Sequence, residues 1–328
     1  MKDNKRIIYM GTPHFAVESL RALVEGGYQV VGVVTMPDKP AGKHQSIPQP
    51  SPVKQYAESA GLTVLQPQSL KNEAFLAELS ALDADLQIVV AFRMLPEVVW
   101  KMPPLGTINL HASLLPQYRG AAPINWAVIK GEEETGVTTF FLSHEIDTGK
   151  IISQRRIPIA DDDDAGAVHD ALMTAGASLL LDTVDRIFAG KAAAVDQESL
   201  YAHTSELRPA PKIFKETCRI DWTQPLKQIY DFIRGLSPYP GAWTELPTSG
   251  ATKQPPGAIK PTLKIYRSEM RIALHHLPCG TICTDGKTHI DVAVEGGYIR
   301  ILSLQLAGRK RMTAADFLRG HRTMLEDD

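Results

Sequence analysis

The sequence is poor in cysteine and has no long apolar run. Of its 328 residues three are cysteines, Cys218, Cys279 and Cys283, too few for the disulfide framework of a small secreted protein. No run approaches the roughly 18 apolar residues that a membrane-spanning helix needs. The apolar stretch before Gly11 is also too short for a secretory signal. We therefore expect a cytoplasmic protein.

The sequence also lacks the patterns of common cofactor sites. The turn after the first predicted strand reads Gly11-Thr12-Pro13 and not G-x-G-x-x-G, which speaks against a nicotinamide dinucleotide. Four consecutive aspartates, 161–164, have poor geometry for a metal and fit a helix cap better. The histidines and cysteines of residues 275–283 match no familiar zinc spacing, so we favour a structural role for them. We predict no metal site.

Length, composition and charge indicate a globular protein with two unlike parts. The length fits about two domains, and 44% of the residues are hydrophobic and 22% charged. Residues 1–205 carry 17 Lys and Arg against 24 Asp and Glu, whereas residues 206–328 carry 18 against 13. The basic second part suits an anionic partner such as nucleic acid, although ordinary surface variation would give the same balance.

The order of predicted elements indicates an α/β fold followed by a small β domain. Val- and Ile-rich strands alternate with amphipathic helices, as in a Rossmann-like, doubly wound, mostly parallel sheet. Short alternating strands after residue 262 indicate an OB-like antiparallel barrel. We predict a catalytic domain at 1–194, a Pro-containing linker at 195–215 and the barrel domain at 216–328.

The stretch GTINLHASLLPQYRGAAP, residues 106–123, is the strongest candidate for chemistry. Asn109 and His111 lie two apart on a predicted strand, so their side chains share one face. Asp147 lies in a later loop, HEIDTGK. Ligands of such sheets bind at the carboxyl ends of the strands. An amide, an imidazole and a carboxylate together can hold an acyl carbon and move its protons.

Two basic segments are candidates for contacts with an anionic partner. Residues 36–52 form a long Pro-rich loop with Lys39 and Lys43; loops of this length are often functional, and a surface insertion is the alternative. Arg309, Lys310 and Arg311 are consecutive cations, which suit phosphate contacts or a solvated loop equally well.

Longer strings resemble the folate-dependent formyltransferases, and among them those that act on methionyl-tRNA. The strings are YMGTPHFA, MPDKPAGK, SPVK, NLHASLLPQYRGAAP, GVTTFFLSHEIDTGKII, PKIFKE, RIDW and LQLAGRKRM. They span nearly the whole chain and are sparsest between residues 247 and 277. The chain departs from the family at Arg93-Met94, where many relatives carry an aromatic residue and a glycine, so the resemblance does not define the pterin pocket there.

The resemblance implies a donor, an acceptor and site residues. The donor would be 10-formyltetrahydrofolate and the acceptor the α-amine of initiator methionyl-tRNA, with no metal or further cofactor. Asn109, His111 and Asp147 match the catalytic trio of the family. Its folate-contacting segment matches Ser113, Leu114, Leu115 and Pro116. The loop with Lys43 matches one that reaches the tRNA acceptor arm.

Three other activities fit parts of the sequence. A formyltransferase acting on a sugar-nucleotide or small ribonucleotide amine would share the trio and the folate segment. A formyl-tetrahydrofolate hydrolase would use water in place of the amine. An RNA-binding adaptor would need neither the trio nor the folate segment, and the intact trio argues against it. The sequence predicts neither the oligomeric state nor a stable protein partner.

Overall fold

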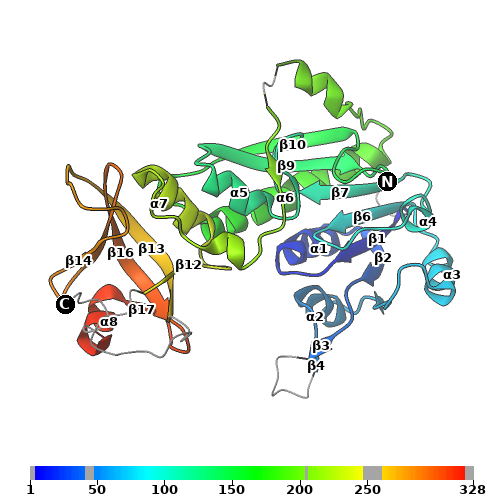
Figure 1. The fold of residues 1–328 in the computed structure, drawn as a ribbon. Helices are drawn as coiled ribbons and strands as arrows, with labels where there is room; N and C mark the ends of the chain where they lie inside the picture. The colour runs from blue at the N-terminus through cyan, green and yellow to red at the C-terminus, as the bar shows by residue number, and fades with distance from the viewer. Residues whose placement is uncertain (1–3, 41–47, 204–205, 247–260, 322–328) are drawn as a thin grey trace. The chain divides into compact units, whose positions relative to one another are not determined.

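The chain forms two compact units, each assembled from separate segments. The computed structural model describes residues 4–40, 48–203, 206–246 and 261–321 (Figure 1). The first unit comprises Met1–Pro123, Glu134–Pro158 and His169–Ala210, and the second comprises Ile124–Glu133, Ile159–Val168 and Pro211–Asp328. Two short segments inside the predicted catalytic domain thus belong to the second unit. Most of the predicted linker belongs to the first.

A seven-stranded sheet organises the first unit. Its strands are β1 (Arg6–Gly11), β2 (Gln29–Val34), β5 (Val64–Leu65), β6 (Leu86–Val90), β7 (Thr107–His111), β9 (Glu134–Phe141) and β10 (Ile151–Pro158). They follow the order β10-β9-β7-β6-β1-β2-β5 (Figure 1). The strands from β7 to β5 are parallel, whereas β9 and β10 each run antiparallel to their neighbours. The prediction of a Rossmann-like, mostly parallel sheet is confirmed.

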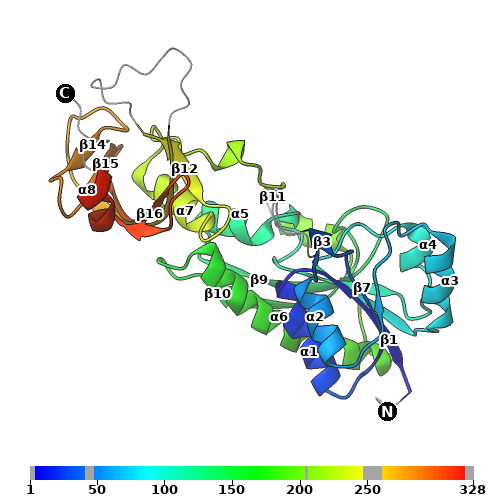
Figure 2. The same cartoon turned by 90° about the horizontal axis from the view of Figure 1, so that it is seen from below.

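Helices cover both faces of this sheet. They are α1 (Phe15–Glu25), α2 (Pro52–Ser59), α3 (Glu73–Ala81), α4 (Glu97–Trp100) and α6 (Ala165–Phe188), whose first turn belongs to the second unit. Alternate residues of a strand face opposite sides. Met10 of β1 therefore packs in the cluster that includes Phe75 of α3 and Val99 of α4, while the Tyr9 hydroxyl donates to the Ala16 carbonyl of α1. Helices α1 and α6 lie side by side (Figure 2).

Two pairs of very short strands and one 3₁₀ turn complete the first unit. Strand β3 (Lys39–Pro40) pairs with β4 (Pro48–Gln49), and β8 (Arg119–Gly120) pairs in parallel with β11 (Pro209–Ala210). The 3₁₀ turn η1 spans Gln197–His203. The segment predicted as a linker is therefore hydrogen-bonded to the first unit and includes a buried residue, Gln197, which is 2% exposed.

The second unit is an antiparallel sheet with helices. Its elements are α5 (Pro123–Ile129, which begins in the first unit), η2 (Glu216–Cys218), α7 (Leu226–Gly235), β12 (Ala242–Glu245), β13 (Thr262–Ile272), β14 (Ile282–Thr284), β15 (Ile290–Val294), β16 (Gly297–Leu306), β17 (Met312–Thr313) and α8 (Ala314–His321). The strands follow the order β12-β13-β16-β15-β14, with β17 beside β16. One apolar core joins α7, α8 and the sheet. The prediction of a second, antiparallel β domain is confirmed.

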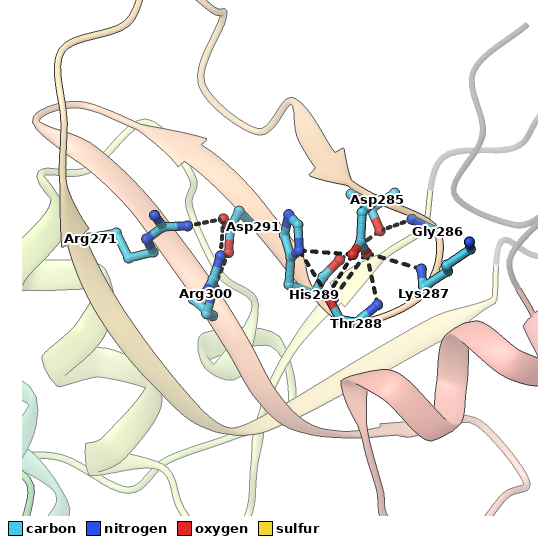
Figure 3. Close-up of polar contacts among 9 residues, drawn as sticks. Arg271, Asp285, Gly286, Lys287, Thr288, His289, Asp291 and Arg300 are labelled. Carbon is cyan, nitrogen blue, oxygen red and sulfur yellow. Dashed lines mark hydrogen bonds and ion pairs between the residues drawn. The ribbon is translucent and has the colours of Figure 1, made fainter.

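A buried carboxylate links three strand segments of this second sheet. Asp291 on β15 is 5% exposed and accepts bonds from Arg300 on β16 and Arg271 on β13 (Figure 3). Burial opposes its charge, but the hydrogen bonds from Arg300 and the charges of both arginines hold the pKa of Asp291 below its usual value. Asp285 accepts hydrogen bonds from the Thr288 hydroxyl and from the backbone amides of Thr288 and Lys287, which lowers its pKa as well (Figure 3).

Most predicted elements are present, with shifted ends. Strand β6 ends at Val90, because Ala91 adopts a positive φ of 48°. Strand β9 begins at Glu134. The acidic run caps α6 as predicted, since Asp164 Oδ1 accepts from the Ala167 amide. None of the helices in the described parts of the chain is long and apolar enough to cross a membrane.

Candidate active site

Strand β7 carries Asn109 and His111 to the carboxyl edge of the parallel strands. Asn109 is in register with Val89 of β6 and Phe140 of β9, and His111 with Thr138 of β9. The Oδ1 atom of Asn109 is buried and has no hydrogen-bond partner within the described residues. An amide that the sheet fixes but does not satisfy is available to a ligand.

The imidazole of His111 is fixed through one ring nitrogen. The residue is 7% exposed, and its Nε2 lies 2.9 Å from the carbonyl oxygen of Tyr118. A carbonyl only accepts, so Nε2 carries a proton in this bond. The other nitrogen, Nδ1, is 3.9 Å from Oδ2 of Asp147. Nε2 is therefore engaged with the backbone, whereas Nδ1 lies on the side of Asp147.

Asp147 lies in the loop after β9, as predicted, and its carboxylate is tied to the loop after β7. Its side chain is 11% exposed, and Oδ2 accepts a 3.0 Å bond from the Gly120 amide. The backbone of Asp147 has a φ of +56°, which is unfavourable for a residue with a Cβ atom and is often found at functional sites. The structure thus brings Asn109, His111 and Asp147 to one end of the sheet.

Residues 113–116 follow His111 and form a turn that hydrogen bonds hold in place. Ser113 is fully buried, and its hydroxyl donates to the Gln117 carbonyl over 2.6 Å. Thr138 of β9 donates to the Ser113 carbonyl and accepts from the Leu115 amide. Leu114 is partly exposed, whereas Leu115 and Pro116 are buried. The bonds to β9 fix the backbone of the predicted folate segment beside His111.

A buried amide beside Asp147 was not among the predicted site residues. Gln197 donates to the Asp147 and Gly149 carbonyls over 2.9 and 2.8 Å. Its Oε1 accepts from Nε and Nη2 of Arg119 over 3.1 and 2.6 Å. The sequence gives no signal for this, because Gln197 lies in a stretch without apolar periodicity and is buried through polar bonds.

The predicted cationic residues differ in their surroundings. Lys39 lies on β3, and Lys43 lies outside the described residues. Arg309 and Lys310 are exposed after β16. Arg311 lies over the Tyr266 ring at 4.5 Å from its centroid and donates to Ser303. This stacked arginine is thus held against the sheet.

Arg93, at the position where we expected a departure from the family, bonds a neighbouring loop. Its guanidinium donates to the carbonyls of Pro67 and Gln68. Its Nε atom is buried without a partner in the described part of the chain, and burial lowers the pKa of Arg93. Met94 is 73% exposed.

Among the side chains considered for a metal site, that of His275 is engaged with the backbone. Nε2 of His275 bonds the carbonyls of Val294 and Gly297, and Cys279 and Cys283 are free thiols. No group of three or more His, Cys, Asp or Glu residues among those described could hold a metal ion.

Fold and site together define a class of protein. An open parallel sheet holds an amide, an imidazole and a carboxylate at its carboxyl edge, where such folds bind ligands. These groups suit an enzyme that acts on an acyl carbon.

Family models and relatives identify the family. Residues 5–184 match the model "Formyl transferase", and residues 212–322 match "Formyl transferase, C-terminal domain". The "Methionyl-tRNA formyltransferase" of Parabacteroides distasonis is 67% identical over 325 residues, which cover 99% of this chain and 98% of the relative. The protein of that name from Phocaeicola vulgatus is 66% identical, with coverage of 98% and 97%. The chain belongs to the formyl transferase family.

Solved structures with low sequence identity share the fold. HypX from Aquifex aeolicus, in complex with tetrahydrofolic acid, has a TM-score of 0.64 at 18% identity, covering 98% of this chain and 48% of HypX. WlaRD, a sugar 3N-formyl transferase crystallised with dTDP and 5-N-formyl-THF, has a TM-score of 0.61 at 18% identity, with coverage of 93% and 99%.

Proposed function

We propose that this chain transfers the formyl group of 10-formyltetrahydrofolate to the α-amine of methionine on initiator tRNA. The product, formylmethionyl-tRNA, would serve translation initiation in the cytoplasm. Relatives that are two-thirds identical over nearly their whole length bear this activity in their names. The observation that carries the proposal is that His111, two residues after Asn109 on β7, lies 3.9 Å from Asp147 and next to the folded turn of residues 113–116.

The acceptor needs little activation. An α-amine has a pKa of about 8, so a sizeable fraction is uncharged at neutral pH. Its nitrogen attacks the formyl carbon, the carbonyl becomes a tetrahedral oxyanion, and the bond from carbon to the folate nitrogen breaks. The proton lost by the amine ends on that folate nitrogen. The enzyme must stabilise the oxyanion and carry this proton.

Each member of the trio has a role in that reaction. The amide N–H groups of Asn109 donate to the oxyanion, while its buried Oδ1, which only accepts, has no partner among the described residues. Protonated His111 donates from Nδ1 to the same oxygen, because its Nε2 is held by Tyr118. Asp147 stabilises this imidazolium from 3.9 Å and helps relay the proton through water. Loss of one donor typically costs about 10²–10³ in rate.

Binding of the two substrates is assigned to separate segments. Ser113, Leu114, Leu115 and Pro116 would contact the folate; Leu114 is the partly exposed member of the four, and the Ser113 hydroxyl is already engaged. Lys39, Lys43, Arg309, Lys310 and Arg311 would contact phosphates of the tRNA.

The test offers the protein one donor and several acceptors. Labelled 10-formyltetrahydrofolate is mixed with initiator methionyl-tRNA, with a sugar-nucleotide amine, or with no acceptor. The proposal predicts label on methionyl-tRNA. Label on the sugar amine would replace it with the sugar-nucleotide activity, and formate without an acceptor would indicate a hydrolase.

A further inference from the structure

One buried side chain, that of Gln197, bonds the backbone of the Asp147 loop from outside the loop. Within the loop, Ser143 and Thr148 bond each other and the Glu145 carbonyl, while Ile146 is 60% exposed. Beyond these local bonds, the Gln197 amide group donates one N–H to the Asp147 carbonyl and one to the Gly149 carbonyl. The backbone on both sides of Thr148 is thereby fixed to η1.

The Gln197 side chain also bonds Arg119, which lies in the segment after β7. Oε1 of Gln197 accepts both bonds from Arg119. Arg119 lies between Tyr118, whose carbonyl binds His111, and Gly120, whose amide binds Asp147. One glutamine therefore connects the loop that carries the carboxylate to the segment that orients both the carboxylate and the imidazole.

Backbone hydrogen bonds fix the chain just before Gln197. Two residues earlier, Val195 forms a pair of 2.8 Å backbone bonds with Ile151 at the start of β10. Both N–H groups and the oxygen of the amide are used. Neither a carboxylate nor a hydrocarbon chain could repeat this pattern, since it needs two donors on one side and an acceptor on the other.

We propose that Gln197 is a positioning residue that sets the separation of Asp147 from His111. The pair is 3.9 Å apart, so a shift of the loop by even a fraction of this distance changes how the carboxylate acts on the imidazole. Misplacement of a reacting group by about 1 Å can cost on the order of 10² in rate. This inference rests on the proposed function for its kinetic effect, but the placement itself can be measured without catalysis.

The test uses two substitutions that remove different bonds of Gln197. Gln197→Glu keeps an oxygen that can accept from Arg119 but loses both N–H donors to the loop, while Gln197→Ala loses the donors and the acceptor. Glu198→Ala, at the exposed neighbour, is the control. We expect Gln197→Glu to lower kcat by about 10- to 100-fold, with the KM of both substrates close to wild type. A Gln197→Glu enzyme with wild-type kcat would overturn the proposal.

A double substitution shows whether Gln197 acts through the carboxylate. In an Asp147→Asn background, Gln197→Glu should lower kcat by no more than about 2-fold, because residues that act as a unit are non-additive. Fully multiplicative losses would overturn the proposal.

A spectroscopic readout separates this inference from the activity. The ¹⁵N resonances of the His111 imidazole, assigned with a His111→Asn sample, should move in Gln197→Glu and stay unchanged in Glu198→Ala. Unmoved resonances in Gln197→Glu would refute the placement role. A wild-type protein that transfers no formyl group to any tRNA would refute the proposed function and leave this measurement intact.

Discussion

Replacing Asp147 by asparagine removes a charge and almost no volume. The asparagine oxygen can still accept from the Gly120 amide, so the loop should keep its place. What is lost is the attraction between the carboxylate and an imidazolium at 3.9 Å, about 4 kcal/mol at the effective dielectric constant of a partly buried site. One tenfold change in rate corresponds to about 1.4 kcal/mol, so the full loss would be near 10³-fold.

We expect Asp147→Asn to reduce kcat by about 10²–10³, because water and the remaining amide dipole recover part of the attraction. The assay is single-turnover transfer of labelled formyl to initiator methionyl-tRNA at saturating enzyme. The KM for tRNA should change little, since Asp147 is not assigned to tRNA binding. Asp182→Asn, at a carboxylate that is 64% exposed, is the control. A kcat within about fivefold of wild type would refute the electrostatic role.

Three further predictions address other parts of the chain. Gly149→Ala should leave little folded protein, because a Cβ atom there would lie 1.6 Å from the Phe141 carbonyl oxygen; circular dichroism checks this, and a native spectrum would contradict it. Asp291→Asn should lower the free energy of unfolding at pH 7 by about 2 kcal/mol. Folding lowers the pKa of Asp291, so the ionised carboxylate stabilises the fold above about pH 4, and this stabilisation is lost as the pH falls through the lowered pKa. In denaturant titrations the free energies of unfolding of wild type and variant should therefore converge in acid. A difference that stays constant with pH would refute this. Arg309→Ser with Lys310→Ser should raise the KM for tRNA more than it lowers kcat and should flatten its dependence on salt, and an unchanged salt dependence would count against a phosphate contact.

Patterns of apolar residues predicted the sheet and the helices, because the central strands are mostly apolar and the amphipathic helices bury one regular face. Helix α1 is one of the expected amphipathic helices, and the prediction that Asn109 and His111 share a strand is confirmed by β7. Gln197 could not be predicted in this way, since its burial depends on carbonyls and a guanidinium brought together only by the tertiary fold. The membership of residues 124–133 and 159–168 in the second unit depends likewise on packing across distant segments.

The catalytic roles of Asn109, His111 and Asp147 stay predictions, and the rate of Asn109→Ala compared with wild type tests them most directly. Wild type and Asn109→Ala are each mixed, at saturating enzyme and in a single turnover, with 10-formyltetrahydrofolate and initiator methionyl-tRNA. The account predicts formylmethionyl-tRNA from wild type and a rate about 10²–10³ lower from Asn109→Ala, with both substrates still bound. Undiminished turnover by Asn109→Ala would contradict it.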